Sequence, residues 1–270
     1  MRRHQPHIVD RRRPGGPATT VVGAPHLIGV GVNGASGGRD AVVLASMFAR
    51  ARQAEVMLIA VYEEPLLEGV VPAELGWTSV ETASRAMLAR TRESLAPQAR
   101  IAVESNPLAW RGLLQVALRE HRDLLVMGST RRAVCGHAAL GDTTAELLSR
   151  APCPVAVAPR GMEDDAGARL ERVGVASDAS PESEAAVALA RSLARGAGAD
   201  LRVRHLDHAT PGAAAEALGD LGAQVDLLVL GAVSSPAPRS APLARATQKL
   251  LSDAPAPMLV VPRRVHAAAI

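Results

Sequence analysis

The stretch "LIGVGVNGASGGRDAVVLASMFARARQAEVMLIAV" (Leu27–Val61) aligns without a gap on "RVGVASDASPESEAAVALARSLARGAGADLRVRHL" (Arg172–Leu206). Two shorter pairs follow in the same order: "DLLVMG" (Asp123–Gly128) with "DLLVLG" (Asp226–Gly231), and "APCPVAVAPR" (Ala151–Arg160) with "APAPMLVVPR" (Ala254–Arg263). Because the repeated unit is as long as a domain, the chain is a fused duplication rather than a solenoid.

In each copy, short apolar runs alternate with segments whose apolar residues recur at helical spacing. Ala41, Leu44, Ala45 and Phe48 form such a stripe in the first copy, and the second copy repeats it. Strict alternation of strands and helices predicts an α/β protein with a parallel sheet covered on both faces. The expected strands of the first copy are residues 26–32, 56–61, 100–104, 124–127 and 155–158, and the expected helices lie near 80–95, 107–121 and 145–150.

The second copy is shorter than the first. The offset between matching residues is 145 for Leu27 and Arg172 but 103 for Asp123 and Asp226, so the second copy lacks 42 residues. One helix and one strand have that length, most simply the counterpart of residues 80–104. We therefore expect a disordered basic tail (1–24), a first domain (25–160), a linker (161–168), a truncated second domain (169–264) and a short tail (265–270).

The positive charge of the chain is concentrated at its beginning. The net charge of the chain is +3. Residues 1–16 alone carry +4, from five arginines and Asp10, so the rest of the chain carries about −1. The folded part is therefore no basic surface for nucleic acid, and only four aromatic residues are available for base stacking. Because no apolar run approaches the roughly 20 residues that cross a bilayer, we expect a cytoplasmic protein without membrane contact.

The chain offers little to a metal ion or to nucleophilic catalysis. Cys135 and Cys153 form no Cys-x-x-Cys pair, and we expect both to be reduced thiols. His205 and His208 have a metal-like spacing, but no cysteine or histidine cluster lies near them in the sequence. No Ser–His–Asp or paired-carboxylate pattern stands out, so the sequence predicts neither a metal site nor a catalytic centre.

The loop after the fourth expected strand is the best candidate for a ligand site, because open α/β sheets bind ligands beyond the carboxyl ends of their strands. It reads "GSTRRAVCGHAALGDTTAELL" (Gly128–Leu148). Gly128 permits a tight turn and a close approach of the main chain to a ligand. Gly141 precedes a helix whose free N–H groups point into the same crevice, and Thr143 with Glu146 has the spacing of a capping box. This arrangement suits a phosphate chain.

Three stretches together resemble one known family. They are "VNGASGGRDA" (Val32–Ala41), the loop quoted above and "LLSRAPCPVAVAPR" (Leu147–Arg160). The chain is similar to the universal stress protein family in its tandem, two-domain form, over nearly everything after residue 24. The resemblance implies two Rossmann-like units of the adenine nucleotide alpha hydrolase type, which associate through their last strands. Many family members bind ATP with magnesium through a Gly-x2-Gly-x9-Gly-Ser/Thr loop and an early aspartate, and others bind no nucleotide.

Carried over residue by residue, the family pattern is only partly kept. Gly128 and Gly141 match the first and third loop glycines, but the second falls on Arg131 and the following hydroxyl position on Asp142. The early aspartate position falls on Asn33. The nucleotide-binding residues implied by the resemblance are Asn33, Val61, Met127, Gly128, Thr130, Arg131, Gly141, Asp142, Thr143 and Thr144.

Three departures from the family pattern have physical consequences. Asn33 still donates and accepts hydrogen bonds but lacks a charged acceptor. Arg131 loses the conformational freedom of glycine and gains a guanidinium that pairs with phosphate. Asp142 is favourable at a helix N-terminus and would occupy the place of an anion, unless its carboxylate holds magnesium. Two interpretations stay open, a nucleotide site and a capped helix without a ligand.

The second copy shows the opposite pattern. Asp178 stands at the aspartate position, but the loop "GAVSSPAPRSAPLARAT" (Gly231–Thr247) contains three prolines, which remove N–H donors that a phosphate needs. We therefore expect no nucleotide site in the second copy.

"SGGRDA" (Ser36–Ala41) is a weaker motif in the first copy. It is similar to the Ser-Gly-Gly-x-Asp-Ser loop of PP-loop ATP pyrophosphatases, but its last serine is replaced by Ala41. We interpret it as the start of a helix that is capped by Ser36.

The expected function is that of a stress-responsive regulatory protein, not an enzyme, which senses ATP through an altered phosphate loop in the first domain. An alternative is a nucleotide-free scaffold, in which residues 155–158 and 258–261 pair to form an intramolecular pseudo-dimer that binds protein partners. A weak ATP hydrolase is a third hypothesis that rests on fold analogy alone. A homodimer of whole chains would bury the sheet edge that the shortened copy exposes.

Overall fold

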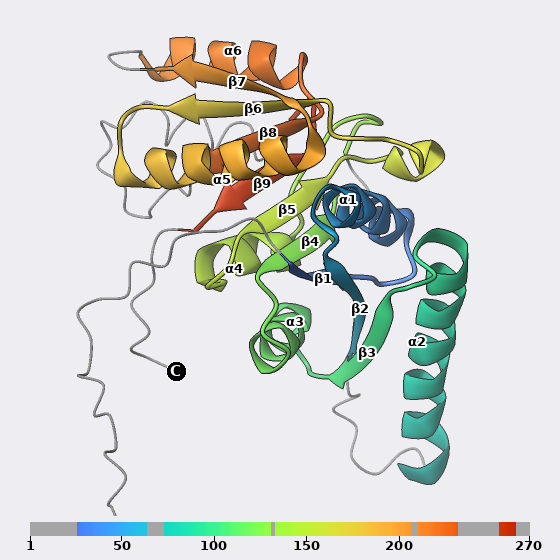
Figure 1. Cartoon of the computed structure of the whole chain (residues 1–270). Coiled ribbons are helices and arrows are strands. Elements are labelled where there is room, and N and C mark those ends of the chain that lie inside the picture. Colours follow the sequence, from blue (N-terminus) through green and yellow to red (C-terminus); the bar gives the residue numbers. More distant parts are fainter. Residues whose placement is uncertain (1–25, 64–72, 131–132, 207–209, 232–253, 263–270) are drawn as a thin grey trace, which may run out of the picture.

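The computed structural model of the chain describes residues 26–63, 73–130, 133–206, 210–231 and 254–262 (Figure 1). The two expected tails, residues 1–24 and 265–270, lie outside these ranges. Nine strands of the described residues form a single sheet in the order β3-β2-β1-β4-β5-β9-β8-β6-β7. Helices cover both faces of this sheet, so the expected α/β fold with two parallel units is confirmed.

The first copy contributes five strands and four α-helices of the described residues. In chain order they are β1 (Leu27–Gly31), α1 (Ser36–Arg52), β2 (Glu55–Tyr62), α2 (Ala73–Leu95), β3 (Arg100–Ser105), α3 (Ala109–Arg119), β4 (Leu124–Gly128), α4 (Asp142–Arg150) and β5 (Val155–Ala158). Each expected strand is present to within two residues at either end. Helix α2 begins at Ala73 rather than near residue 80, because a helix continues beyond the apolar stripe from which periodicity detects it.

The second copy follows after a short 3₁₀ helix, η1 (Met162–Asp165), within the expected linker. Its elements are β6 (Arg172–Ser177), α5 (Pro181–Ala197), β7 (Asp200–His205), α6 (Pro211–Gly222), β8 (Leu227–Gly231) and β9 (Met258–Val261). Local sequence explains why its helices begin where they do. Ser180 and Thr210 each accept a backbone N–H with the side chain, and each is followed by a proline at the first helical position.

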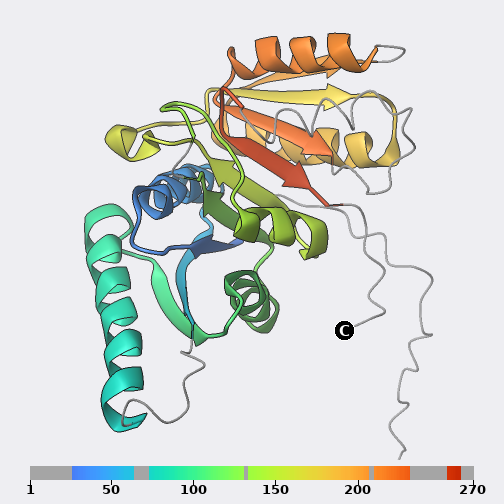
Figure 2. The ribbon, with the colours of Figure 1, turned by 180° about the vertical axis from the view of Figure 1, so that it is seen from behind.

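The second copy repeats the sheet of the first without one edge unit. Strands β6, β7, β8 and β9 follow the order of β1, β2, β4 and β5, and the described residues hold no counterpart of α2 and β3. Helix α6 packs Leu218 and Leu221 on Leu228 and Met258, on the sheet face opposite α1 and α5. This is the face that α3 and α4 cover in the first copy, and Figure 2 brings α4 to the front. The expectation of a truncated second unit is therefore confirmed.

Strands β5 and β9 join the two copies. They pair antiparallel with Ala156 opposite Leu259, whereas the other neighbouring strands of the sheet are parallel. On one face, Ala156 and Leu259 belong to a single apolar cluster that also contains Phe48 of α1 and Leu193 of α5. The interface between the copies is thus a continuous core, and the predicted intramolecular pairing of the last strands is present.

A repeated aspartate explains why "DLLV" occurs in both copies. The Asp123 carboxylate accepts the backbone N–H groups of His26 and Leu27 at 2.9 Å each. Its counterpart Asp226 accepts those of Glu171 and Arg172 at 2.9 and 2.8 Å. In both copies the aspartate accepts main-chain N–H groups at the start of the first strand. Those groups would otherwise lack an acceptor in the hydrogen-bond ladder of the sheet.

Gly196 allows α5 to approach α1 closely. A Cβ atom at Gly196 would lie 2.9 Å from the carbonyl oxygen of Ala51 and 2.4 Å from Cδ of Arg52. We expect Gly196→Ala to lower the free energy of unfolding by about 1–2 kcal/mol, because overpacking separates the two helices. Gly219→Ala is the matched control, since a Cβ there meets no described atom within 4 Å, and it should stabilise α6 by about 0.5–1 kcal/mol. Urea unfolding measures both, and equal stabilities of the two variants would contradict the packing argument.

Candidate functional site

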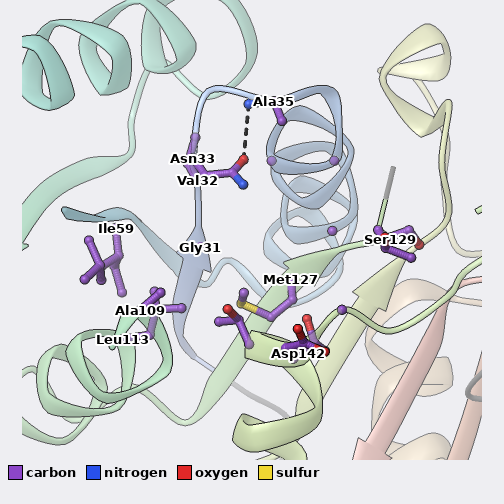
Figure 3. Close-up of a pocket in the computed structure, with 18 residues that line it drawn as sticks. Gly31, Val32, Asn33, Ala35, Ile59, Ala109, Leu113, Met127, Ser129 and Asp142 are labelled. Atoms are coloured by element: carbon purple, nitrogen blue, oxygen red, sulfur yellow. Dashed lines mark hydrogen bonds between the residues drawn. The ribbon is translucent and has the colours of Figure 1, made fainter. Parts of the chain in front are cut away.

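A pocket of about 330 Å³ lies beyond the carboxyl ends of β1 and β4. The chain leaves β1 for β2 on one side, whereas β4 lies on the other side, so the pocket stands where the strand order reverses. Its volume falls within the range of small-molecule sites. In Figure 3, Ile59, Ala109 and Leu113 gather on one side of the pocket, Ser129 lies on the other, and Asp142 stands at the start of α4.

The structure brings together nine of the ten residues predicted for nucleotide binding. They come from the turn after β1, from β2, from the end of β4 and from the start of α4. Arg131, the tenth, lies outside the described residues. The nine that line the pocket are Asn33, Val61, Met127, Gly128, Thr130, Gly141, Asp142, Thr143 and Thr144.

Sequence reasoning missed the apolar floor of the pocket. Ile59 and Leu113 contribute side chains, and Gly31 contributes the end of β1. A Cβ at Gly31 would lie 2.7 Å from the sulfur of Met127, so the glycine makes room for that thioether. A glycine near the end of an apolar strand is the only signal that could have pointed to this floor.

Gly128 is required by packing within the protein. A Cβ at Gly128 would lie 1.8 Å from the carbonyl oxygen of Gly37, and one at Gly37 would lie 2.7 Å from that of Ser129. The start of α1 therefore lies directly on the end of β4, a contact that only two glycines allow. Gly128 also lines the pocket, so its close approach to a ligand stays a prediction beside its packing on α1.

Asn33 stabilises the turn between β1 and α1. Its side-chain oxygen accepts the N–H of Ala35 at 3.1 Å, the dashed line in Figure 3. In the second copy, Asp178 makes the same turn by accepting the N–H of Ser180 at 3.2 Å. An amide therefore replaces the carboxylate without loss of local structure. Asn33 is exposed, and its amide nitrogen is a potential donor to a ligand.

Two predicted helix caps differ from the structure. Helix α4 begins at Asp142 with Gly141 as its N-cap, so Thr143 lies inside the helix and makes no capping box with Glu146. Glu146 instead pairs with Arg150 at 2.7 Å. Helix α1 begins at Ser36, as "SGGRDA" suggested, but its N-cap is Ala35 and Ser36 is the first helical residue. Both helix starts therefore lack a side-chain cap and leave N–H groups for other acceptors.

The N-termini of α1 and α4 meet at the pocket, and both carry positive partial charge. Asp142, exposed in the first turn of α4, is the single carboxylate among the described residues that line the pocket, and none of those residues is basic. An anion bound there would therefore be held by main-chain donors and hydroxyl groups and opposed by Asp142. A cation beside Asp142 would remove that repulsion.

Asp40, the acid of "SGGRDA", points away from the pocket to the linker. It is fully buried and accepts the N–H groups of Glu163 at 2.8 Å and Gly161 at 3.3 Å. Arg39 pairs with the side chain of Glu163 beside it. Burial raises the pKa of Asp40 above its ordinary value, and the charge of Glu163 adds to this, while the donated N–H groups oppose it. The carboxylate thus fixes η1 on α1, and only Gly37 and Gly38 of the motif line the pocket.

Both cysteines are free thiols, as predicted. Cys135 is exposed, whereas burial raises the pKa of Cys153 to about 12, which keeps it protonated at neutral pH. Among the described residues, no three His, Cys, Asp or Glu side chains are grouped as metal ligands. His205 is exposed on β7, and His208 lies outside the described residues. None of the helices described is long and apolar enough to span a membrane.

Comparison with known proteins agrees with this fold. The model of the universal stress protein family matches residues 26–159. No curated protein sequence matches the chain. The chain is therefore a member of the universal stress protein family, and the fold class is a tandem pair of Rossmann-like units.

Two solved structures resemble both copies together, and a third is similar over a smaller part of the chain. A universal stress protein from Archaeoglobus fulgidus DSM 4304 is 15% identical, with a TM-score of 0.66 over 90% of this chain and 97% of that chain. A functionally unknown protein from Pseudomonas aeruginosa PAO1 is 13% identical, with a TM-score of 0.60 over 91% and 95%. A universal stress protein solved in complex with cAMP is 17% identical, with a TM-score of 0.32 over 67% and 98%. At these identities the first two establish the fold alone.

The buried carboxylate of Asp40 leads to a prediction about pH. Because its pKa is raised in the folded state, its contribution to stability is fully present below its unfolded pKa of about 3.9 and is lost as the pH rises through the folded pKa. Asp40→Asn cannot titrate, so we expect the stability of this variant relative to wild type to improve as the pH rises from 3 to 7. Asp40→Ala should show the same trend from a lower baseline, since it accepts neither N–H group. Urea unfolding at each pH measures the difference, and a wild-type advantage that grows with pH would contradict the argument.

Proposed function

We propose that the protein is a cytoplasmic, stress-responsive regulatory protein that binds ATP with magnesium in the pocket of its first copy, and that it is not an enzyme. The observation that carries the proposal is the convergence of nine predicted residues on one pocket between two uncapped helix N-termini. The apolar floor formed by Ile59 and Leu113 suits the face of a purine, and the helix N-termini suit phosphates.

The residues of the pocket fit a magnesium ion bound together with phosphates. Mg²⁺ prefers oxygen ligands and is commonly held by one or two carboxylates plus substrate phosphates. Asp142 supplies a carboxylate at the start of α4, and Thr143 adds a hydroxyl beside it. Magnesium would neutralise the charge of Asp142, which otherwise repels a phosphate.

A scaffold without nucleotide is the second candidate function. The exposed carboxylate of Asp142 favours it, because Asp142 already lies at the helix N-terminus where a phosphate would bind. In that case, the two copies joined through β5 and β9 would act through protein partners, and the pocket would stay free of nucleotide.

A thermal-shift titration with Mg–ATP tests the binding site directly. We expect a saturable rise in Tm that corresponds to about 2.7 kcal/mol at 100 times Kd. Gly141→Trp should abolish the rise by filling the pocket. Gly141→Ala is the matched control, because a Cβ there comes no closer than 4.0 Å to Thr130 and the backbone φ of −96 suits any residue. Absence of a shift at millimolar ATP, or an unchanged shift in Gly141→Trp, would contradict the site and favour the scaffold.

The role of Asp142 is tested by comparing ATP with and without magnesium. We expect magnesium to strengthen ATP binding to the wild type by about tenfold, or about 1.4 kcal/mol, because it cancels the repulsion between Asp142 and the phosphates. In Asp142→Ser, ATP should bind equally well with and without the metal, which isothermal titration calorimetry measures. If the variant keeps the full effect of magnesium, Asp142 does not hold the ion.

A further inference from the structure

In the described part of the chain, strand β7 is an open edge of the sheet, because the shortened second copy has no counterpart of β3 there. Within the described residues β7 pairs with β6 alone, whereas its counterpart β2 is paired with β3 along Met57–Tyr62. Figure 1 shows β7 at the end of the sheet opposite β3. An open edge of this kind presents unpaired main-chain groups to another strand.

The main-chain groups that point outward from β7 are identified by its pairing with β6. The N–H of Asp200 donates to Glu171 at 2.8 Å, and the N–H of Leu206 donates to Ser177 at 2.8 Å. Since the direction of these groups alternates along a strand, the even-numbered residues face β6. The N–H and C=O groups of Leu201, Val203 and His205 therefore face outward.

The apolar and the charged side chains of β7 lie on opposite faces of the sheet. Val203 is 37% exposed, and with His205 it lines a pocket of about 330 Å³ beside Val187 and Arg191 of α5. Leu201 packs against the apolar cluster that contains Phe48 of α1 and Leu193 of α5. Arg202 lies on the other face, where its guanidinium donates to Gln224 near the end of α6 at 3.1 Å. Apolar and charged residues thus alternate along the edge.

We propose that this edge is a homodimer interface, in which β7 of two chains pair antiparallel about a two-fold axis at Arg202. In this register, Leu201 is opposite Val203 of the partner subunit, and both have outward N–H and C=O groups, so they form hydrogen-bonded pairs. Asp200 is opposite Arg204 of the partner subunit, on the other face. Symmetry makes each pair twice, which gives two apolar and two oppositely charged contacts.

Charge complementarity excludes one neighbouring register, and strand overlap excludes the other. A slip of two residues in one direction places Arg202 opposite Arg204 of the partner subunit twice, and like charges directly opposite are destabilising. A slip in the other direction centres the pair on Leu201. Because β7 begins at Asp200, only Asp200–Arg202 then pair with the strand of the partner subunit, whereas Asp200–Arg204 do in the proposed register. In the proposed register, the one like-charge pair lies at the axis, where Gln224 draws Arg202 toward α6.

This dimer would use a different edge from the pairing of β5 and β9. That pairing is already made within one chain, so the proposed dimer would join two whole chains into one sheet through their β7 strands. The proposed interface lies at β7, the last strand of the sheet, whereas the pocket of the first copy lies at the ends of β1 and β4. The proposal is therefore independent of nucleotide binding.

Sedimentation velocity of charge-swapped full-length variants tests the interface. We expect the wild type to dimerise, and Asp200→Arg and Arg204→Asp each to raise the dimer Kd by about tenfold, because each replaces two attractive pairs by two repulsive ones. The double variant Asp200→Arg/Arg204→Asp restores opposite charges and should return the Kd to the wild-type value. Arg90→Asp, the same charge change on exposed α2, is the control and should leave the Kd unchanged.

Val203→Pro removes an outward N–H that pairs with no group of the described residues, and proline is tolerated at such edge positions. We expect this variant to keep wild-type circular dichroism and to sediment as a monomer. A wild type that remains monomeric at all concentrations overturns the proposal. A dimer that withstands Val203→Pro and both single charge changes, or a double variant that fails to recover, overturns it as well.

Discussion

The antiparallel pairing of β5 with β9 is the interaction on which the rest of the structure depends. Each copy reaches this point with a four-residue strand whose outer main-chain groups would otherwise lack partners. Joining the two strands satisfies both edges at once and places α1 and α5 side by side over a continuous apolar core. Because β5 and β9 run in opposite directions, the carboxyl ends of the strands in one parallel unit point the opposite way from those in the other unit. Any ligand sites of the two copies therefore face opposite ways.

This junction explains how the second copy tolerates the loss of a helix and a strand. The missing unit corresponds to α2 and β3, at the edge of the sheet farthest from the junction, so β8 and β9 keep both of their neighbours. The loss instead leaves β7 as an edge strand with charged and apolar residues in alternation. The pocket of the first copy is unaffected, because β1, β4, α1 and α4 lie between the junction and the intact edge.

Helix α1 connects the pocket with the linker between the copies. Its first turn packs on the end of β4 through Gly37 and Gly128, and Asp40 one turn later accepts the N–H groups of Gly161 and Glu163 at the start of η1. A ligand at the N-terminus of α1 would therefore touch the same helix that positions the linker and contacts α5. Close glycine packing and a buried carboxylate leave this helix little room to move independently of either neighbour.

The duplication, the alternation of strands and helices, and the missing edge unit were all readable from the sequence, because each is a pattern of apolar spacing along the chain. Residues such as Gly128, Gly141 and Asp142 were also found there, since a family motif holds them in one loop. The helix caps were misjudged at Ser36 and Thr143, because cap spacing fits several neighbouring starts and packing selects among them. Ile59 and Leu113, the contact of Gly37 with Gly128 and the turn of Asp40 toward the linker followed only from the folded chain, since they join residues that are distant in sequence and carry no motif.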